Sequence, residues 1–228
     1  MTAPIHIGIL LFPRVTQLDA TGPAQVLARV PGATLHMIWK TRDPVPTDAG
    51  FSIVPTTTFA DCPQLDVICV PGGGGQVDLM TDDETLDFLR KQAATARYVT
   101  SVCTGSLVLG AAGLLKGYRS ACHWASRDLL KDFGAIPVAE RVVRDRNRLS
   151  GGGVTAGIDF GLTLLAELAG EDVAKSVQLG LEYDPQPPFQ SGSPEKAGVE
   201  RVKQVREQMG PMLERRQKAN AAAAARLA

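Results

Sequence analysis

The sequence predicts an α/β protein with a mainly parallel sheet and helices on both faces. Short apolar segments typical of strands alternate with helical segments almost from the first residue. Several of the apolar segments are nearly continuous, as expected of strands that are buried on both faces. Glycine-rich turns lead from two of these segments into helices, which is typical of strand-to-helix connections in such folds.

The first third of the chain contains two predicted strands and one helix. Residues 5–12 form an apolar run that ends at Pro13, and residues 34–39 form a second strand. Between them we expect a helix over residues 21–28, because Pro23 is tolerated in a first turn and Pro31-Gly32 would stop the helix. Residues 43–58 hold three prolines and four threonines, which indicates a hairpin with edge character.

The next elements repeat the alternation. A buried strand over 65–70 runs into four glycines, and Thr81 or Asp82 begins a helix to residue 96 with acidic residues in its first turn. A strand from Tyr98 turns sharply at Cys103 into a small-residue helix. The remaining expected elements are a short strand at 120–123, a helix at 126–133, a hairpin at 141–149 and a long apolar helix at 155–168.

The end of the chain differs in composition. A proline-rich segment follows Tyr183, and Ser193-Pro194 begins a charged helix that breaks near Gly210-Pro211. A second helix ends in the alanines 221–225, and the two have too few apolar positions for a core of their own. We therefore expect an α/β domain over residues 1–193 and a helical extension over residues 194–228 that packs on the body or on a partner subunit.

Composition excludes several classes of protein. Of the 228 residues 44% are hydrophobic and 21% charged, and 24 basic side chains balance 24 acidic ones, which argues against a nucleic-acid or membrane partner. The extension carries eight basic and four acidic side chains, which indicates a solvated helix face. The absence of a signal-like or membrane-spanning segment predicts a cytoplasmic protein, and four cysteines without C-x-x-C spacing predict free thiols.

The cysteine at the corner is the leading candidate for chemistry. A nucleophile on a sharp strand-to-helix turn needs small neighbours, and Ser101, Gly105 and Ser106 supply them. We expect the helix N-terminus to lower the pKa of the Cys103 thiol from its ordinary value of about 8.5. The other cysteines are expected to be structural: Cys69 within its strand, Cys122 within the strand at 120–123, and Cys62 in a loop.

The glycines at 72–75 follow a neighbouring predicted strand. Glycine lets backbone N–H groups approach a ligand closely, so this loop could hold developing charge beside Cys103. No G-K-[ST] or G-x-G-x-x-G pattern follows, which argues against a nucleotide site. A plain turn is the alternative interpretation.

Together these motifs resemble the ThiJ/PfpI superfamily, which is class I glutamine amidotransferase-like and has a flavodoxin-like sheet. The resemblance covers residues 5 to about 183 and rests on the strand-Pro-Gly-Gly at 67–73, Ser-Val-Cys-Thr-Gly-Ser at 101–106 and His123. Phe-Pro-Arg-Val-Thr-Gln-Leu-Asp-Ala-Thr-Gly-Pro at 12–23 and Gly-Gly-Gly-Val-Thr-Ala-Gly-Ile-Asp at 151–159 are similar to the isocyanide hydratase branch.

The resemblance implies a homodimeric enzyme that adds water to an isocyanide through a thioimidate and yields an N-substituted formamide, with no metal or cofactor. Cys103 matches the nucleophile, Asp19 the acidic partner that shares a proton with it, and Thr104 the neighbour of the nucleophile. Asp19 could instead be a helix cap, and His123 could be either a supporting or a structural residue. The implied oxyanion- and substrate-binding positions are Gly72, Gly73 and Val154, with the N–H groups of Gly73 and Thr104 as the anion hole.

Two alternative functions remain, and a third, a transcriptional regulator, is disfavoured. Glyoxalase or deglycase chemistry on 2-oxoaldehydes also begins with a thiolate, but members with that activity usually carry Glu where this chain has Asp19. A redox sensor would oxidise Cys103 to a sulfenic or sulfinic acid. Regulators with an AraC-type DNA-binding module share the same motifs, but that module needs about 100 residues and only 35 follow from Pro194 onward.

Overall fold

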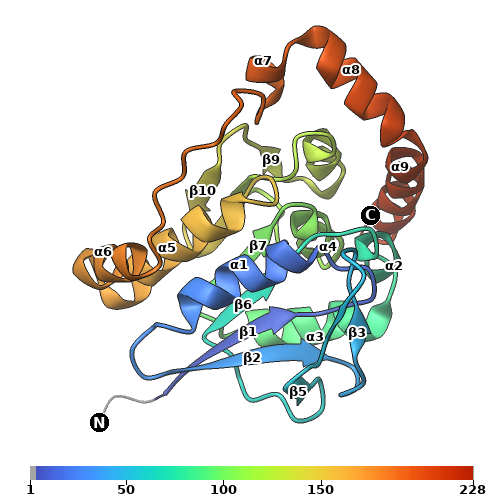
Figure 1. Cartoon of the computed structure of the whole chain (residues 1–228). Coiled ribbons are helices and arrows are strands. Elements are labelled where there is room, and N and C mark those ends of the chain that lie inside the picture. Colours follow the sequence, from blue (N-terminus) through green and yellow to red (C-terminus); the bar gives the residue numbers. More distant parts are fainter. Residues whose placement is uncertain (1–3, 228) are drawn as a thin grey trace.

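The computed structural model describes residues 4–227 and has a twisted, mainly parallel sheet at its centre (Figure 1). Along the sheet the strands follow the order β10-β11-β7-β6-β1-β2-β5, and every neighbouring pair is parallel except β10 with β11. The α/β, flavodoxin-like fold class is therefore confirmed. The strands are β1 (Ile5–Leu10), β2 (Ala33–Trp39), β5 (Thr57–Thr58), β6 (Val67–Val70), β7 (Tyr98–Val102), β10 (Val142–Asp145) and β11 (Arg148–Gly151).

Helices cover both faces of this sheet (Figure 1). On one face α1 (Gln17–Leu27) packs against α5 (Ala156–Ala169), which also contacts α6 (Glu171–Gly180). On the other face lie α3 (Asp83–Ala93), α4 (Gly105–Ala111) and the 3-10 helix η1 (Arg127–Phe133). Burial of apolar strand residues between these two layers supplies the main driving force for folding. The largest fully buried side chains of this hydrophobic core include Phe12, Phe160, Ile7, Ile9 and Leu11.

The register of the central strands brings two loops together. Val70, the last residue of β6, lies opposite Ser101 in β7. The glycine loop and the turn at Cys103 therefore begin side by side at the carboxyl ends of their strands. The short helix α2 (Gln76–Leu79) directly follows the glycine loop.

Smaller pairs of strands lie outside the main sheet. The predicted hairpin over 43–58 contains an antiparallel pair, β3 (Val45–Pro46) and β4 (Ser52–Ile53), while β5 joins the edge of the main sheet beside β2. A second, parallel pair consists of β8 (Arg119–Ser120) and β9 (Ile136–Pro137).

The prediction for the first helix was wrong at its N-terminus. Helix α1 begins at Gln17, not near Thr21, so Asp19 lies inside its first turn. The backbone N–H of Gln17 donates to Oδ1 of Asp48 over 3.1 Å, and that of Thr16 donates to the Gly72 carbonyl over 3.0 Å. These distant partners satisfy the first amides of the helix, and local sequence shows neither of them.

The predicted strand at 120–123 was also too long. Strand β8 ends at Ser120, and the next N–H, of Ala121, donates to a side chain, the hydroxyl of Ser150 in β11, over 2.8 Å. Cys122 consequently lies in the loop after β8 and not in a strand. It is buried, as expected of a structural thiol.

The C-terminal extension forms α7 (Pro194–Ala197), α8 (Val199–Gln208) and α9 (Gly210–Ala225). Residues 184–193 and α7 lead away from the body, and α8 returns to it (Figure 1). Helix α9 then packs against α2, α4 and η1. Over the described residues, the helices lack the combination of length and apolar character needed to cross a membrane.

Candidate active site

The candidate site lies at the topological switch point of the sheet, between β1 and β6, where successive strands begin to be added on the opposite side. From β1 the chain continues to β2 on one side, whereas from β6 it continues to β7 on the other side. In open α/β sheets the loops at such a switch point diverge and leave a crevice at the carboxyl ends of the strands. Asp19, Gly72 and Cys103 lie in the segments that follow β1, β6 and β7.

Cys103 occupies a strained turn. Its φ is 58°, in the left-handed region that residues other than glycine rarely adopt. The backbone is held there by the Cys103 N–H, which donates to the Gly151 carbonyl over 3.0 Å, and by the Ser106 hydroxyl, which donates to the Cys103 carbonyl over 3.2 Å. A Cβ on Gly105 would come within 1.9 Å of the Val70 carbonyl oxygen. This is the geometry of a nucleophile elbow.

Asp19 is fully buried beside this turn. Its Oδ2 accepts a hydrogen bond from the Gly72 N–H over 3.0 Å, and the Cys103 thiol lies against the carboxyl group. Oδ1 is buried and has no hydrogen-bond partner of ordinary geometry among the described residues. Burial raises the pKa of Asp19 from 3.8 to about 7, while its contacts with Cys103 and Gly72 oppose the rise. The carboxyl group can therefore hold or release a proton near neutral pH.

The expectation of a lowered pKa for Cys103 was wrong. Only 5% of the residue is exposed, and burial together with the charges of Asp19 and Cys122 raises the pKa of its thiol well above the usual range. The backbone N–H of Thr104 opposes this rise. Because both groups favour their protonated forms, the first proton to leave belongs to the Cys103–Asp19 pair and not to either residue alone.

The glycine loop packs closely against Asp19 and Thr104. A Cβ on Gly72 would come within 2.6 Å of the Thr104 backbone nitrogen and 2.8 Å of Oδ2 of Asp19, so no larger residue fits without a shift. The Gly73 N–H donates to Oγ1 of Thr104 over 3.2 Å. In this structure the N–H groups of Gly72 and Gly73 thus hold Asp19 and Thr104 in place.

His123 lies in the loop after β8 and is partly buried. Its Nδ1 accepts a hydrogen bond from the Ala125 N–H over 3.3 Å. Burial, and next the positive charge of Arg216, lower the pKa of His123 to about 4. The imidazole is therefore neutral at physiological pH.

Val154 lies in the turn between β11 and α5, three residues after the Gly151 carbonyl that accepts from Cys103. It is partly buried and packs against the core. Arg141 holds the same turn from outside, because it contacts the Thr155 carbonyl and pairs with Asp159. The structure therefore places Val154 on the α5 side of the elbow.

Sequence reasoning missed a buried polar cluster of three residues, Gln76, Ser126 and Arg216. Arg216 of α9 is 4% exposed and donates to Oε1 of Gln76 over 2.8 Å and to the Ser126 hydroxyl over 2.9 Å. The extension as a whole was interpreted as a solvated face. The available signal was spacing: Arg216, Asn220 and Ala223 follow the i, i+4, i+7 pattern of one helix face, and all three are buried.

Fold and site together define a flavodoxin-like α/β protein with a cysteine on a nucleophile elbow. The chain belongs to the DJ-1/PfpI family, whose model matches residues 6–167.

Comparisons with individual proteins extend over the C-terminal helices. The chain is 59% identical over 223 residues to an isonitrile hydratase from Pseudomonas putida, with 98% of each chain covered. A crystal structure of a ThiJ/PfpI family protein from Pseudomonas syringae superposes with a TM-score of 0.90 at 47% identity, covering 98% of this chain and 91% of that one.

The chain also matches the HTH-type transcriptional regulator GbdR from Pseudomonas aeruginosa (strain UCBPP-PA14). The two are 30% identical over 190 residues, which cover 79% of this chain and 51% of the regulator. The chain therefore spans about half the length of that relative.

Proposed function

We propose that this protein is an isocyanide hydratase, which converts an isocyanide and water into an N-substituted formamide. The observation that carries the proposal is the 59% identity to an isonitrile hydratase over essentially the whole of both chains. The site supports it, because an elbow cysteine lies against a carboxyl group that can hold a proton near neutral pH. Such a pair can deliver a nucleophile and a proton to the same carbon.

In the first step the Cys103–Asp19 pair holds one proton, which lies on the Asp19 carboxyl group, and the Cys103 thiolate attacks the terminal carbon of the isocyanide. A carbon–sulfur bond forms, the lone pair of that carbon takes up a proton from the Asp19 carboxyl, and the product is a thioimidate. The unpartnered Oδ1 is the oxygen available to present this proton, since Oδ2 accepts from Gly72. The carboxyl group is left as a carboxylate.

In the second step the Asp19 carboxylate removes a proton from water, whose oxygen attacks the thioimidate carbon. The Asp19 carboxyl group passes the proton taken from water to the nitrogen, the carboxylate then takes the proton of the new hydroxyl group as the carbon–sulfur bond breaks, and the formamide leaves with Cys103 as a thiolate. The sulfur and the carboxyl group return to their starting protonation, so Asp19 acts first as acid and then as base. The short approach of Gly72 to Asp19 and Thr104 keeps the carboxyl group beside the sulfur throughout.

The direct test follows loss of a simple alkyl isocyanide and appearance of its formamide with purified variants. Cys103→Ala should lower kcat/KM by about four orders of magnitude or more, as expected when a nucleophile is removed. Cys62→Ala, which removes a partly buried loop thiol, is the matched control and should keep wild-type activity. Turnover by Cys103→Ala at the wild-type rate would refute the covalent route.

Asp19→Asn separates the two steps. The amide keeps the size of the side chain but cannot supply the proton, so hydration should stop, and mass spectrometry should find either no adduct or a persistent one on Cys103. Methylglyoxal assayed beside the isocyanide tests the 2-oxoaldehyde chemistry. Faster turnover of methylglyoxal than of isocyanides would overturn the proposal.

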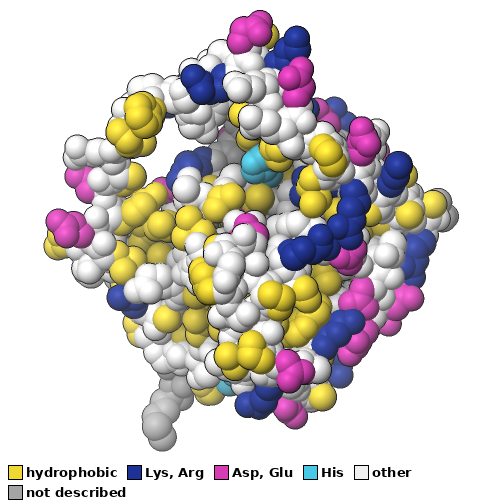
Figure 2. Space-filling model, turned by 45° about the vertical axis from the view of Figure 1, so that its right-hand side comes forward, with side chains coloured by type: hydrophobic (Ala, Val, Ile, Leu, Met, Phe, Trp, Pro, Cys, Tyr) yellow, Lys and Arg dark blue, Asp and Glu magenta, His cyan; other side chains and the backbone are white. Residues whose placement is uncertain are grey.

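We also propose that the protein is a cytoplasmic homodimer, as the sequence and the family resemblance suggest. An apolar groove between α1 and α5 supports self-association, and hydrophobic side chains gather on the face below the arch formed by residues 184–198 and α8 (Figure 2). Light scattering should give twice the monomer mass of 24.2 kDa. The groove is lined by Leu18, Thr21, Gly22, Gln25, Val26, Ile158, Leu181 and Tyr183.

A further inference from the structure

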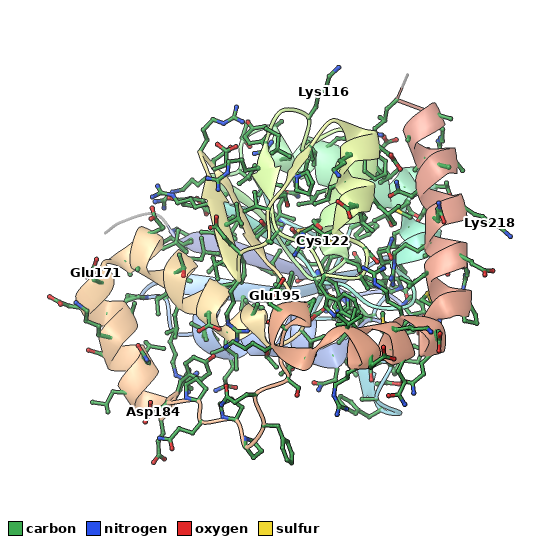
Figure 3. The ribbon with its side chains drawn as sticks, turned by 90° about the horizontal axis from the view of Figure 1, so that it is seen from above. Lys116, Cys122, Glu171, Asp184, Glu195 and Lys218 are labelled. Atoms are coloured by element: carbon green, nitrogen blue, oxygen red, sulfur yellow. The ribbon has the colours of Figure 1, made fainter. Side chains whose placement is uncertain are left out.

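Helix α9 turns one polar face toward the interior of the protein. Arg216 and Asn220 are 4% and 0% exposed, although both side chains are polar. Lys218, between them in the sequence, points outward in Figure 3, whereas Cys122 lies in the interior. A long polar side chain loses rotamer freedom and hydration when it is buried, so its position calls for compensating contacts.

Arg216 connects two loops that flank the cysteine. Its Nε donates to Gln76, which begins α2 directly after the glycine loop, over 2.8 Å. Its Nη1 donates over 2.9 Å to the hydroxyl of Ser126, whose own N–H donates to the His123 carbonyl over 2.9 Å. The guanidinium of Arg216 therefore holds both the end of the glycine loop and the loop that carries Cys122 and His123.

Among the described residues, the charge of Arg216 has no carboxylate partner. Within residues 4–227 no Asp or Glu oxygen lies within 4.0 Å of its guanidinium. Burial lowers the pKa of Arg216, whereas interaction with the thiols of Cys122 and Cys103 raises it. An arginine stays protonated under these conditions, so a positive charge remains buried near the nucleophile.

The buried guanidinium of Arg216 offers a positive charge, which the Cys103–Asp19 pair itself lacks. Attack on a substrate requires a negative charge on the sulfur, in a site where burial disfavours any charge. A fixed positive charge lowers the cost of forming that anion. Asp19 of α1 and Cys122 act on the Cys103 thiol, whereas Arg216 of α9 and Arg127 of η1 act on the Cys122 thiol. Arg216 interacts with Cys122 most strongly and also with Cys103. His123, in the loop after β8, is neutral at physiological pH and contacts Cys122 through its backbone.

We propose that Arg216 is a positioning residue for the reaction at Cys103, which holds the two flanking loops and supplies the positive charge that favours the anionic sulfur. This inference rests on the proposed hydratase function. It gives the C-terminal extension a role in the site, although the extension lies outside the residues that the family model matches. The isonitrile hydratase match covers 98% of both chains and so includes the extension.

The test compares Arg216→Gln with two controls on the same helix. Arg215→Gln removes an exposed arginine that pairs with Asp78, and Asn220→Ala loosens the docking of α9 while leaving the charge in place. For each variant, the rate at which iodoacetamide alkylates Cys103 is followed by mass spectrometry from pH 6 to 10. Circular dichroism verifies folding, and kcat/KM for an isocyanide is measured over the same range.

Arg216→Gln should move the midpoint of Cys103 alkylation upward by about one pH unit, which is about a tenfold slower reaction at neutral pH. The kcat/KM profile should shift in parallel, Arg216→Lys should recover part of the shift, and both controls should keep the wild-type midpoint. A folded Arg216→Gln protein with a wild-type midpoint would overturn the proposal. So would an equal shift in Asn220→Ala, because docking alone would then explain the effect.

A replacement variant and the substrate independence of the alkylation assay keep the test decisive. If the Gln variant does not fold, Arg216→Met keeps most of the aliphatic volume without the charge and is judged by the same midpoint. Alkylation does not depend on the substrate, so it tests the role of Arg216 even if the wild-type protein fails to hydrate isocyanides. That failure would refute the proposed function and not the electrostatic role.

Discussion

Replacing Asp19 by Asn should stabilise the folded protein at alkaline pH while abolishing its activity. Asp19 is buried, and its pKa is raised from 3.8 to about 7. The native state consequently binds this proton more tightly than the unfolded chain does. Wild-type stability should fall as the pH rises from about 4 through 7, because the native carboxyl group is then forced to ionise in a buried site.

The size of the effect follows from the same two values. By linkage, the raised pKa costs the wild-type protein about 2 kcal/mol at pH 5 and about 4 kcal/mol at pH 8. Asn has no proton to lose, so this cost disappears in the variant. Burying an unpaired amide N–H adds an opposing cost of about 1–3 kcal/mol, but that cost does not vary with pH. The gain at pH 8 should therefore exceed the gain at pH 5 by about 2–3 kcal/mol.

Urea unfolding of both proteins at the two pH values measures this difference. Asp172→Asn, an exposed substitution at the start of α6, is the control and should change stability equally at both pH values. An Asp19→Asn effect that varies by less than about 1 kcal/mol between pH 5 and pH 8 would show that the carboxyl group ionises in the native state as it does in water. The proton-sharing mechanism would then lose its physical basis.

The remaining predictions concern the glycine loop and the histidine. Gly72→Ala should lower kcat/KM about 100-fold or more, because its Cβ would lie 2.6 Å from the Thr104 backbone nitrogen. Gly74→Ala should remain near wild type, because its Cβ would meet the flexible end of Met212 at 3.4 Å and Cβ of Arg14 at 4.0 Å, which are tolerable contacts. Equal activity of the two variants would contradict this geometry. His123→Gln should keep activity within about tenfold and retain the inflection near pH 7 in the kcat/KM profile, because the His123 pKa of about 4 leaves the ring neutral there. Loss of that inflection would assign it to His123 and not to the Cys103–Asp19 pair.

The local sequence determined the architecture and the turn at Cys103. Continuous apolar runs separated by helical segments predicted a mainly parallel sheet, because burial on both faces leaves little room for polar residues. The small residues around Cys103 predicted its strained turn, since Gly105 packs within contact distance of the Val70 carbonyl. Such steric requirements act over a few residues and are therefore visible in the sequence.

Tertiary structure alone decided the electrostatics of the site. The start of α1, and with it the position of Asp19, depends on Asp48 and Gly72, which are distant in sequence. The direction of the Cys103 pKa shift depends on burial, which outweighed the helix N-terminus that the sequence suggested. The inward face of α9 brings Arg216 to Gln76, 140 residues away. Desolvation and charge pairing depend on distances in the folded chain, and neighbouring residues do not encode those distances.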